Sequence, residues 1–248
     1  MARNNMAKKI TPYQNSNSSK KNQVREMFDT ISGNYDGLNR MMTFGIDRSW
    51  RKQVVALVSK TKPKKILDIA TGTGDLAIML AQIDDSQVTG LDLSPGMLEI
   101  GKQKVFAAGL DKQVDMVIGD SEKLPFDDDS YDAITVSYGV RNFEDLNKGL
   151  LEINRVLRPG GILVILETSL PTKFPYKQGY NVYSKTLLPL LGTLFSKDKE
   201  AYSYLSNSAK AFPFGKEFNK ILEQNSFTQV KDRPVTMGVS TIYTAFKS

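Results

Sequence analysis

A glycine-rich loop with carboxylates on both sides is the first part of the sequence that could do chemistry. In the stretch LDIATGTGDLA, Gly72, Gly74 and Ala77 fit the G-x-G-x-x-A form of the dinucleotide-binding fingerprint. Asp68 precedes these glycines and Asp75 follows them. A loop that binds phosphate offers N–H groups to a negative ligand, and two carboxylates beside it would repel that ligand. A cationic ligand without phosphate suits the loop better, and S-adenosylmethionine is the first candidate.

Two further carboxylates follow apolar runs downstream. Asp92, with Leu93 beside it, comes 20 residues after Gly72, where a carboxylate can accept hydrogen bonds from both ribose hydroxyls of a dinucleotide or of S-adenosylmethionine. Asp120, with Ser121 beside it, suits an exocyclic adenine amine, which the dinucleotide fingerprint does not require. Either aspartate alone could be a turn or N-cap residue. Together with the glycine loop, they favour one shared ligand.

The composition excludes several other chemistries. The 248 residues include no cysteine and no histidine, so a thiolate nucleophile, a histidine base and the commonest metal ligands are excluded, and no metal site is expected. Five of the six net positive charges lie in the first 22 residues, which contain no acidic residue. This basic segment is expected to be a solvated tail, and no nucleic-acid partner is expected. No apolar run is long enough to span a membrane, so a cytoplasmic protein is expected.

The elements that must position these residues alternate between apolar runs and helical patterns. Strands are expected near residues 64–70, 86–94, 113–120, 131–139 and 161–168, separated by helices, which is typical of a parallel sheet. Two final strands, near residues 227–235 and 238–246, are close enough to pair antiparallel. The helix before the fifth strand is expected to carry Leu146, Leu150, Ile153 and Leu157 on one face and to stop at the RPGG sequence. The closing hairpin favours a methyltransferase arrangement.

The expected organisation is a disordered tail over residues 1–22 and one methyltransferase domain over residues 23–248. A helical cap covers residues 23–61, and a helical insertion covers residues 172–212, after the fifth strand. The most apolar part of this insertion is YNVYSKTLLPLLGTLF, residues 180–195. Either it lines a substrate pocket and touches a membrane, or it packs as a lid or dimer surface.

Several motifs in order resemble a known family. The sequences ATGTGD, LDLSPGML, GDSEKLPF, SYGVRN and EINRVLRPGG, with YDGLNRMMTFGIDRSWR before them and AYSYLSNSAKAFPFGKEF after them, resemble the ubiquinone/menaquinone biosynthesis C-methyltransferases, and most closely their demethylmenaquinone methyltransferase branch. The resemblance runs from about Val24 to the C-terminus. It implies a Rossmann-like class I S-adenosylmethionine-dependent methyltransferase fold, with a seven-stranded, mostly parallel sheet whose final strand is antiparallel. One departure is Thr71, where the family often has glycine.

The resemblance also implies roles for individual residues. The cofactor residues of the family fall on Thr73 in the loop, on Asp92, and on three others: Asp120, Ser121 and Ser137. Arg141 and Asn142 correspond to the pair that faces the quinol pocket, and Tyr35 lies in the NYDGLN segment, which is selective for the family. The implied reaction is C-methylation of a prenylated demethylmenaquinol to menaquinol, the last step of menaquinone biosynthesis. The substrate is a lipid quinol, so peripheral contact with the inner face of the cytoplasmic membrane is expected.

Such a reaction needs a group that accepts a proton. A water held by Arg141 and Asn142, a nearby carboxylate, or Tyr35 could serve, and the Arg141 guanidinium could stabilise a developing phenolate. The alternative for Arg141 is a salt bridge with Glu144 or Asp145, and for Tyr35 a position in the aromatic core.

Other functions remain open at this point. These are methylation of a benzoquinol precursor of ubiquinone, a generic small-molecule methyltransferase, a short-chain dehydrogenase, and a non-enzymatic module that binds an adenosyl ligand. A short-chain dehydrogenase would have a tyrosine followed four residues later by a lysine, and the sequence has no such pair in a suitable place after the fourth strand. The presence of Arg141 and Asn142 counts against the non-enzymatic module. The sequence leaves the oligomeric state open, a homodimer included.

Overall fold

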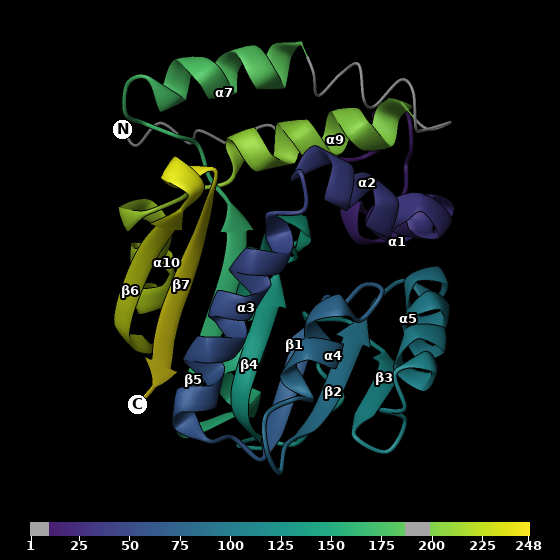
Figure 1. Ribbon diagram of the computed structural model, residues 1–248, viewed down its shortest axis with the longest axis vertical. Coiled ribbons are helices and arrows are strands. Elements are labelled where there is room, and N and C mark those ends of the chain that lie inside the picture. Colours follow the sequence, from purple (N-terminus) through teal and green to yellow (C-terminus); the bar gives the residue numbers. More distant parts are fainter. Residues whose placement is uncertain (1–9, 187–198) are drawn as a thin grey trace.

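A seven-stranded sheet forms the centre of the structure (Figure 1). The computed structural model describes residues 10–186 and 199–248. The strand order is β3-β2-β1-β4-β5-β7-β6, and only β7 runs antiparallel to its neighbours. The strands are β1 (Lys65–Ile69), β2 (Gln87–Asp92), β3 (Val114–Ile118), β4 (Tyr131–Ser137), β5 (Leu157–Thr168), β6 (Phe227–Val235) and β7 (Ser240–Lys247). The predicted sheet, with its antiparallel final strand, is confirmed.

Helices cover both faces of the sheet, because the central strands are apolar on both sides. In β5, Leu163 and Ile165 pack on the face covered by α6 and α10, while Val164 and Leu166 pack on the face covered by α3, α4 and α5 (Figure 1). This two-sided burial is typical of parallel strands. The helices are α1 (Lys20–Ile31), α2 (Tyr35–Met42), α3 (Asp47–Val58), α4 (Asp75–Leu80), α5 (Pro95–Ala107), α6 (Leu146–Val156), α7 (Tyr176–Lys185), α9 (Lys199–Ala211) and α10 (Lys216–Gln224).

Two predicted boundaries are wrong. Helix α6 ends at Val156, and Leu157 begins β5, where it pairs with Tyr131. Pro159 explains the early end, because a proline disfavours helical backbone in the residue before it. The third strand ends at Ile118, and Asp120 instead forms an isolated bridge with Lys123 in the following turn. The N-cap of α5 is as expected, since the Ser94 hydroxyl accepts a hydrogen bond from Met97 N.

The tail prediction is wrong for residues 10–22. Helix α1 begins at Lys20, capped by the hydroxyl of Ser19, and Ile10 and Tyr13 pack against a small apolar cluster formed by α1, α5 and α9. The side chain of Gln23, which is buried, accepts a hydrogen bond from Tyr13 N at 2.9 Å and donates one to Ser18 O at 2.8 Å. Residues 1–9 lie outside the described residues.

Helices α7 and α9 follow β5 in the segment predicted as an insertion, and both lie at the end of the sheet where β4 and β5 finish (Figure 1). Residues 187–198, which include most of the apolar block 180–195, lie outside the described residues. Across residues 10–186 and 199–248, no helix combines the length and the apolar character needed to cross a membrane.

Candidate active site

The carboxyl ends of neighbouring strands carry the polar residues of the site. Strand order reverses between β1 and β4, and open α/β sheets bind ligands at such a switch point. Asp92 ends β2, Ser137 ends β4, and Glu167 is the next-to-last residue of β5. The glycine loop leaves β1 between them.

The glycine loop folds back against the end of β2. Gly72 N donates a hydrogen bond to Asp92 Oδ2 at 2.8 Å, and Thr71 N donates to Leu91 O at 3.0 Å. Gly72 and Gly74 have φ of 58° and 79°, a left-handed backbone that glycine adopts without steric cost. A side chain at Gly72 would also meet Tyr35, whose ring lies 3.9 Å from the position of a Cβ there.

Asp68 lies beneath this loop and lines neither of the two cavities described below. It is 1% exposed, and its carboxylate accepts hydrogen bonds from the hydroxyls of Thr71 and Thr135, both at 2.6 Å. Burial raises the pKa of Asp68 to about 6. Asp75 pairs with Lys104 and lies 3.7 Å from Arg51. Protein groups therefore satisfy both flanking carboxylates, which weakens the electrostatic reason for preferring a cationic ligand.

Substituting Asp68 with asparagine tests this buried carboxyl group. Its pKa of about 6 in the folded protein exceeds the value of about 3.9 in an unfolded chain, so the charged form destabilises the fold above about pH 6 and this penalty is relieved as the pH falls. The free energy of unfolding of the parent should therefore rise, relative to Asp68→Asn, by about 1 kcal/mol between about pH 7.5 and about pH 5. Urea unfolding measures this difference. A difference that does not change with pH would contradict the assignment.

Most of the predicted cofactor residues line one cavity of about 80 Å³. They are Gly72, Asp92, Leu93, Asp120, Ser121 and Ser137. The Asp92 carboxylate accepts hydrogen bonds from Gly72 N and Ser94 N, and burial raises its pKa. The Ser137 hydroxyl is buried and has no hydrogen-bond partner among the described residues. We name this space the small cavity.

Helix α1 closes the small cavity on the side away from the sheet, which the sequence did not predict. Val24 and Phe28 contribute apolar surface to the cavity. Lys21 Nζ lies 2.6 Å from Asp120 Oδ2, while Asp120 Oδ1 accepts a hydrogen bond from Glu122 N. Both carboxylate oxygens of Asp120 therefore already have partners from the protein.

Thr73 and Gly74 are not among the residues that line either cavity. The Thr73 hydroxyl donates to Asp36 Oδ1 at 2.6 Å, and Lys104 Nζ lies 2.8 Å from Asp36 Oδ2. Lys104 also pairs with Asp75, the first residue of α4. In this structure Thr73 belongs to a network that ties α2 to the glycine loop.

Arg141 lines a second, larger cavity of about 820 Å³, which we name the large cavity. Its partner is Glu167 at 2.8 Å, so the predicted alternatives, Glu144 and Asp145, are both wrong. The side chains of Arg141 and Glu167 are 8% and 0% exposed. Burial lowers the pKa of Arg141, but the charge of Glu167 outweighs this effect, and the net pKa is raised. Arg141 Nε has no hydrogen-bond partner among the described residues.

Asn142 lines the small cavity and is held on two sides. Its Nδ2 donates to Tyr138 O at 3.3 Å, and its Oδ1 accepts from the Tyr204 hydroxyl at 3.1 Å. Tyr204 is a buried residue of α9, so the inserted segment positions this side chain. Lys20 Nζ adds a third link, because it donates to Arg141 O at 3.0 Å.

Two tyrosines line both cavities, and they are the only residues common to the two linings among the described residues. Tyr35, from the start of α2, is half-buried, and burial raises its pKa, so the phenolate form that could accept a proton is disfavoured. Tyr138 has a left-handed φ of 58°, and its hydroxyl lies 3.3 Å from Ser240 Oγ. The two cavities therefore adjoin at these two residues.

Sequence reasoning missed Tyr138, Glu167, Tyr204 and Lys21. Tyr138 lies within the SYGVRN motif and Tyr204 within the AYSYLSNSAKAFPFGKEF motif, and these motifs were the available signals. Glu167 and Lys21 meet the site only through the tertiary fold.

Comparisons with known proteins agree over nearly the whole chain. A family model described as the ubiE/COQ5 methyltransferase family matches residues 16–247. The chain is similar to a demethylmenaquinone methyltransferase of Bacteroides fragilis, with 46% identity over 240 residues that cover 96% of this chain and 98% of that protein. It is also similar to a demethylmenaquinone methyltransferase of Porphyromonas gingivalis, with 43% identity over 241 residues that cover 96% and 98%.

A relative with another name shows similar identity. A ubiquinone/menaquinone biosynthesis C-methyltransferase of Geotalea daltonii is 44% identical over 227 residues, which cover 91% of this chain and 96% of that protein. Among solved structures, a putative O-methyltransferase from Nostoc punctiforme has a TM-score of 0.63 at 16% identity, covering 89% of this chain and 60% of that chain. At that identity the likeness shows the fold alone.

Proposed function

Because the chain belongs to the ubiE/COQ5 methyltransferase family, we propose that it transfers a methyl group from S-adenosylmethionine to a ring carbon of demethylmenaquinol, which gives menaquinol. Relatives named demethylmenaquinone methyltransferase, at 46% and 43% identity over nearly their full lengths, support this substrate. The two adjoining cavities, which could hold a donor and an acceptor, also support the proposal.

The observation that carries the proposal is the meeting of the two cavities at Tyr35 and Tyr138. Asp92 lines the small cavity, and aromatic and aliphatic residues of α2, α7 and α9 line the large cavity. Methyl transfer requires the two reactants to be held at near-attack distance. Two cavities that share Tyr35 and Tyr138 in their linings adjoin one another, and this could bring the reactants together.

The residues of the small cavity fit S-adenosylmethionine. The Asp92 carboxylate would accept from the ribose hydroxyls, and the Ser137 hydroxyl is a buried polar group that a ligand could satisfy. Asp120 and Ser121 would face the adenine. When bound, S-adenosylmethionine supplies an electrophilic methyl group and a neutral leaving group.

On the acceptor side, a quinol hydroxyl would lose its proton to water, and Arg141 would stabilise the resulting phenolate, which makes the ring carbon nucleophilic. After methyl transfer the methylated ring carbon would release its proton to water, which restores the aromatic ring. A guanidinium remains charged at any physiological pH, and its N–H groups can donate hydrogen bonds to an oxyanion. The pair with Glu167 fixes the guanidinium at the edge of the large cavity, and Nε has no hydrogen-bond partner among the described residues. We place Tyr35 in the wall between the reactants instead of assigning it the role of a base, because burial disfavours its phenolate.

A prenylated quinol keeps its tail in a bilayer, so we propose peripheral contact between the protein and the inner face of the cytoplasmic membrane. The large cavity would hold the head group and the first part of the tail. Tyr180 and Tyr183, which lie in the described part of the predicted apolar block, residues 180–186, line this cavity.

A turnover assay with two reduced head groups tests the proposal. Purified protein with S-adenosylmethionine should methylate a short-chain demethylnaphthoquinol faster than the corresponding benzoquinol precursor of ubiquinone. Faster methylation of the benzoquinol would instead identify a ubiquinone precursor as the substrate. The absence of both products, with folded protein that binds S-adenosylmethionine, would favour a non-catalytic binding module.

Substituting Lys21 with methionine should strengthen cofactor binding. In the parent, the adenine amine must share Asp120 with Lys21 Nζ, which lies 2.6 Å away. Loss of this partly exposed ion pair should raise affinity for S-adenosylmethionine by up to about fivefold, the size of a weak surface pair. Calorimetry measures the change, and Lys102→Met, an exposed lysine of α5, controls for the loss of one charge. A weaker affinity would mean that Lys21 contacts the ligand itself.

A further inference from the structure

Exposed hydrophobic side chains concentrate at the mouth of the large cavity. Across the described residues, nine large hydrophobic side chains are exposed, and six of them lie on three segments around this mouth. Four of the six also line the cavity. The six are Phe44 and Ile46 between α2 and α3, Phe174, Tyr176 and Val182 in and before α7, and Met237 between β6 and β7.

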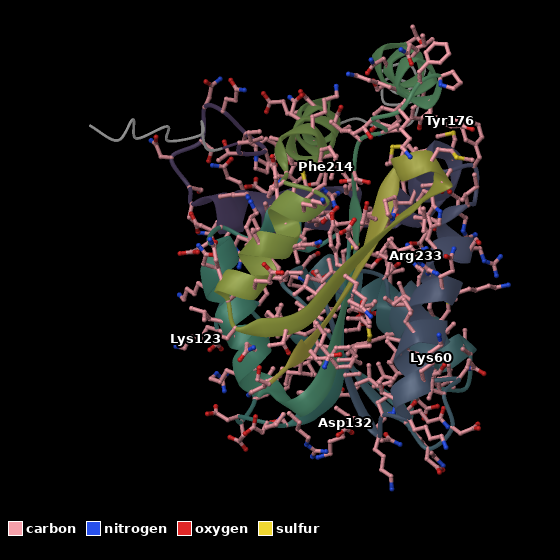
Figure 2. All side chains as sticks on the ribbon, turned by 90° about the vertical axis from the view of Figure 1, so that its left-hand side faces the viewer. Lys60, Lys123, Asp132, Tyr176, Phe214 and Arg233 are labelled. Atoms are coloured by element: carbon pink, nitrogen blue, oxygen red, sulfur yellow. The ribbon has the colours of Figure 1, made fainter. Side chains whose placement is uncertain are left out.

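The three segments are neighbours in space. The rings of Phe44 and Tyr183 lie 6.4 Å apart, and the Tyr183 hydroxyl donates to Met42 O at 2.7 Å, which joins α7 to the last residue of α2. Trp50 Nε1 donates to Thr236 Oγ1 at 2.8 Å, which joins α3 to the turn between β6 and β7. Figure 2 shows Tyr176 at the same end of the molecule as this turn, with Asp132 at the opposite end.

Two of these exposed side chains lie on unfavourable backbone. Phe44 and Met237 have φ of 52° and 58°, a left-handed conformation that is uncommon for bulky residues. They are 70% and 62% exposed. A large hydrophobic residue at such a position gains neither burial nor a relaxed backbone, and strain of this kind occurs where a function maintains it.

The charges on the same segments are of one sign at the surface. Arg40, Arg48, Lys173 and Lys177 are exposed. Residues 40–48, 171–184 and 235–239 include one acidic residue, Asp47. It is 2% exposed, and its side chain pairs with Arg51. A surface with exposed apolar and cationic groups, and with its carboxylate buried, is complementary to anionic lipid head groups over acyl chains.

We propose that these six side chains form a docking face for an anionic lipid bilayer, which places the mouth of the large cavity against the membrane. This inference rests on the proposed function, since a prenylated substrate explains why a cavity would open toward lipid. The face differs from the apolar block 180–195 predicted from sequence, because two of its three segments lie outside that insertion.

Vesicle flotation without substrate tests the docking face. Phe44→Asn with Met237→Asn replaces both residues with one that tolerates a left-handed backbone, so the variant should fold. Its partitioning onto phosphatidylcholine vesicles that contain phosphatidylglycerol should fall at least about tenfold. Phe106→Gln is the matched control, because Phe106 on α5 is 76% exposed and lies outside the face. Equal partitioning of the double variant and the parent would overturn the proposal.

Two further variants test whether the face prefers anionic lipid and whether its effect is independent of catalysis. Lys173→Glu with Lys177→Glu should reduce partitioning onto anionic vesicles more than onto vesicles of phosphatidylcholine alone. Phe174→Ser with Val182→Ser, neither of which lines a cavity, should keep turnover of a short-chain quinol and lose turnover of a long-chain quinol in vesicles. A different result would identify the face as an interface between copies of the chain. The parent would not bind vesicles and would sediment as a dimer, whereas the Phe44 and Met237 double variant would sediment as a monomer. Flotation remains informative even if no quinol is methylated.

Discussion

Substituting Arg141 with methionine is expected to lower the free energy of unfolding by about 3 to 5 kcal/mol, the cost of leaving a buried charge without its partner. Glu167 is fully buried, and its pair with Arg141 at 2.8 Å is the charge contact that offsets this burial. Turnover should fall by about 100-fold or more, because a donor aimed at a developing oxyanion is lost. Affinity for S-adenosylmethionine should remain, since Arg141 lines the large cavity and not the small one. Urea unfolding, initial rates and calorimetry measure the three quantities.

The double variant Arg141→Met with Glu167→Gln separates structure from catalysis. Glutamine has nearly the shape of glutamate and carries no charge, so most of the lost stability should return. Turnover should stay low, because no guanidinium faces the acceptor. Recovery of both stability and turnover would show that Arg141 acts only as the structural partner of Glu167.

Substituting Asp92 with alanine is expected to weaken S-adenosylmethionine binding by about 2 to 3 kcal/mol, which is roughly 30- to 150-fold in the dissociation constant. The ribose hydroxyls would lose a charged acceptor. The structure adds a second cause, because the same carboxylate holds Gly72 N at 2.8 Å and Ser94 N at 2.9 Å. The loop that shapes the small cavity would loosen at the same time. Calorimetry on the folded variant measures the loss.

Asp68→Asn is the control for this experiment. It changes the support beneath the same loop, yet its side chain lines neither cavity. Its effect on affinity should be much smaller than that of Asp92→Ala. If the two substitutions weaken binding equally, loop geometry and not a ribose contact explains the role of Asp92.

The sequence predicted the sheet and the residues at its carboxyl edge, because both depend on local pattern. Apolar runs alternate with helical periodicity, and parallel strands bring their carboxyl ends to one edge, so Gly72, Asp92 and Asp120 line one cavity. Ser137, which only the resemblance indicated, lines the same cavity. The same pattern could not show that Asp68 turns inward. Its environment is set by hydroxyls of Thr71 and of Thr135, 67 residues away in the sequence.

The partner of Arg141 was mispredicted for a physical reason. Spacings of three and four residues bring side chains together only on a continuing helix. The 3-10 helix η3 (Val140–Asn142) ends just after Arg141, and Phe143 leaves it with ψ of 140°. Asp145 then serves as the N-cap of α6, and the guanidinium turns instead to Glu167 on the neighbouring strand.

Sequence patterns could not predict the contacts that join distant segments. The pair of Lys21 with Asp120 spans 99 residues, and the bond from Thr73 to Asp36 spans 37. Both depend on where the N-terminal helices pack, which no periodicity within them specifies. The resemblance placed Thr73 at the cofactor, whereas in the structure its hydroxyl donates a hydrogen bond to Asp36 of α2.

The central claim is that the two cavities hold a methyl donor and a quinol on opposite sides of Tyr35 and Tyr138. A single-turnover reaction of the full chain with methyl-labelled S-adenosylmethionine and demethylmenaquinol, analysed by mass spectrometry and NMR of the product, tests it most directly. We expect one label on the ring carbon for each S-adenosylhomocysteine formed. Label on a quinol oxygen, or S-adenosylhomocysteine formed without labelled quinol, would contradict it.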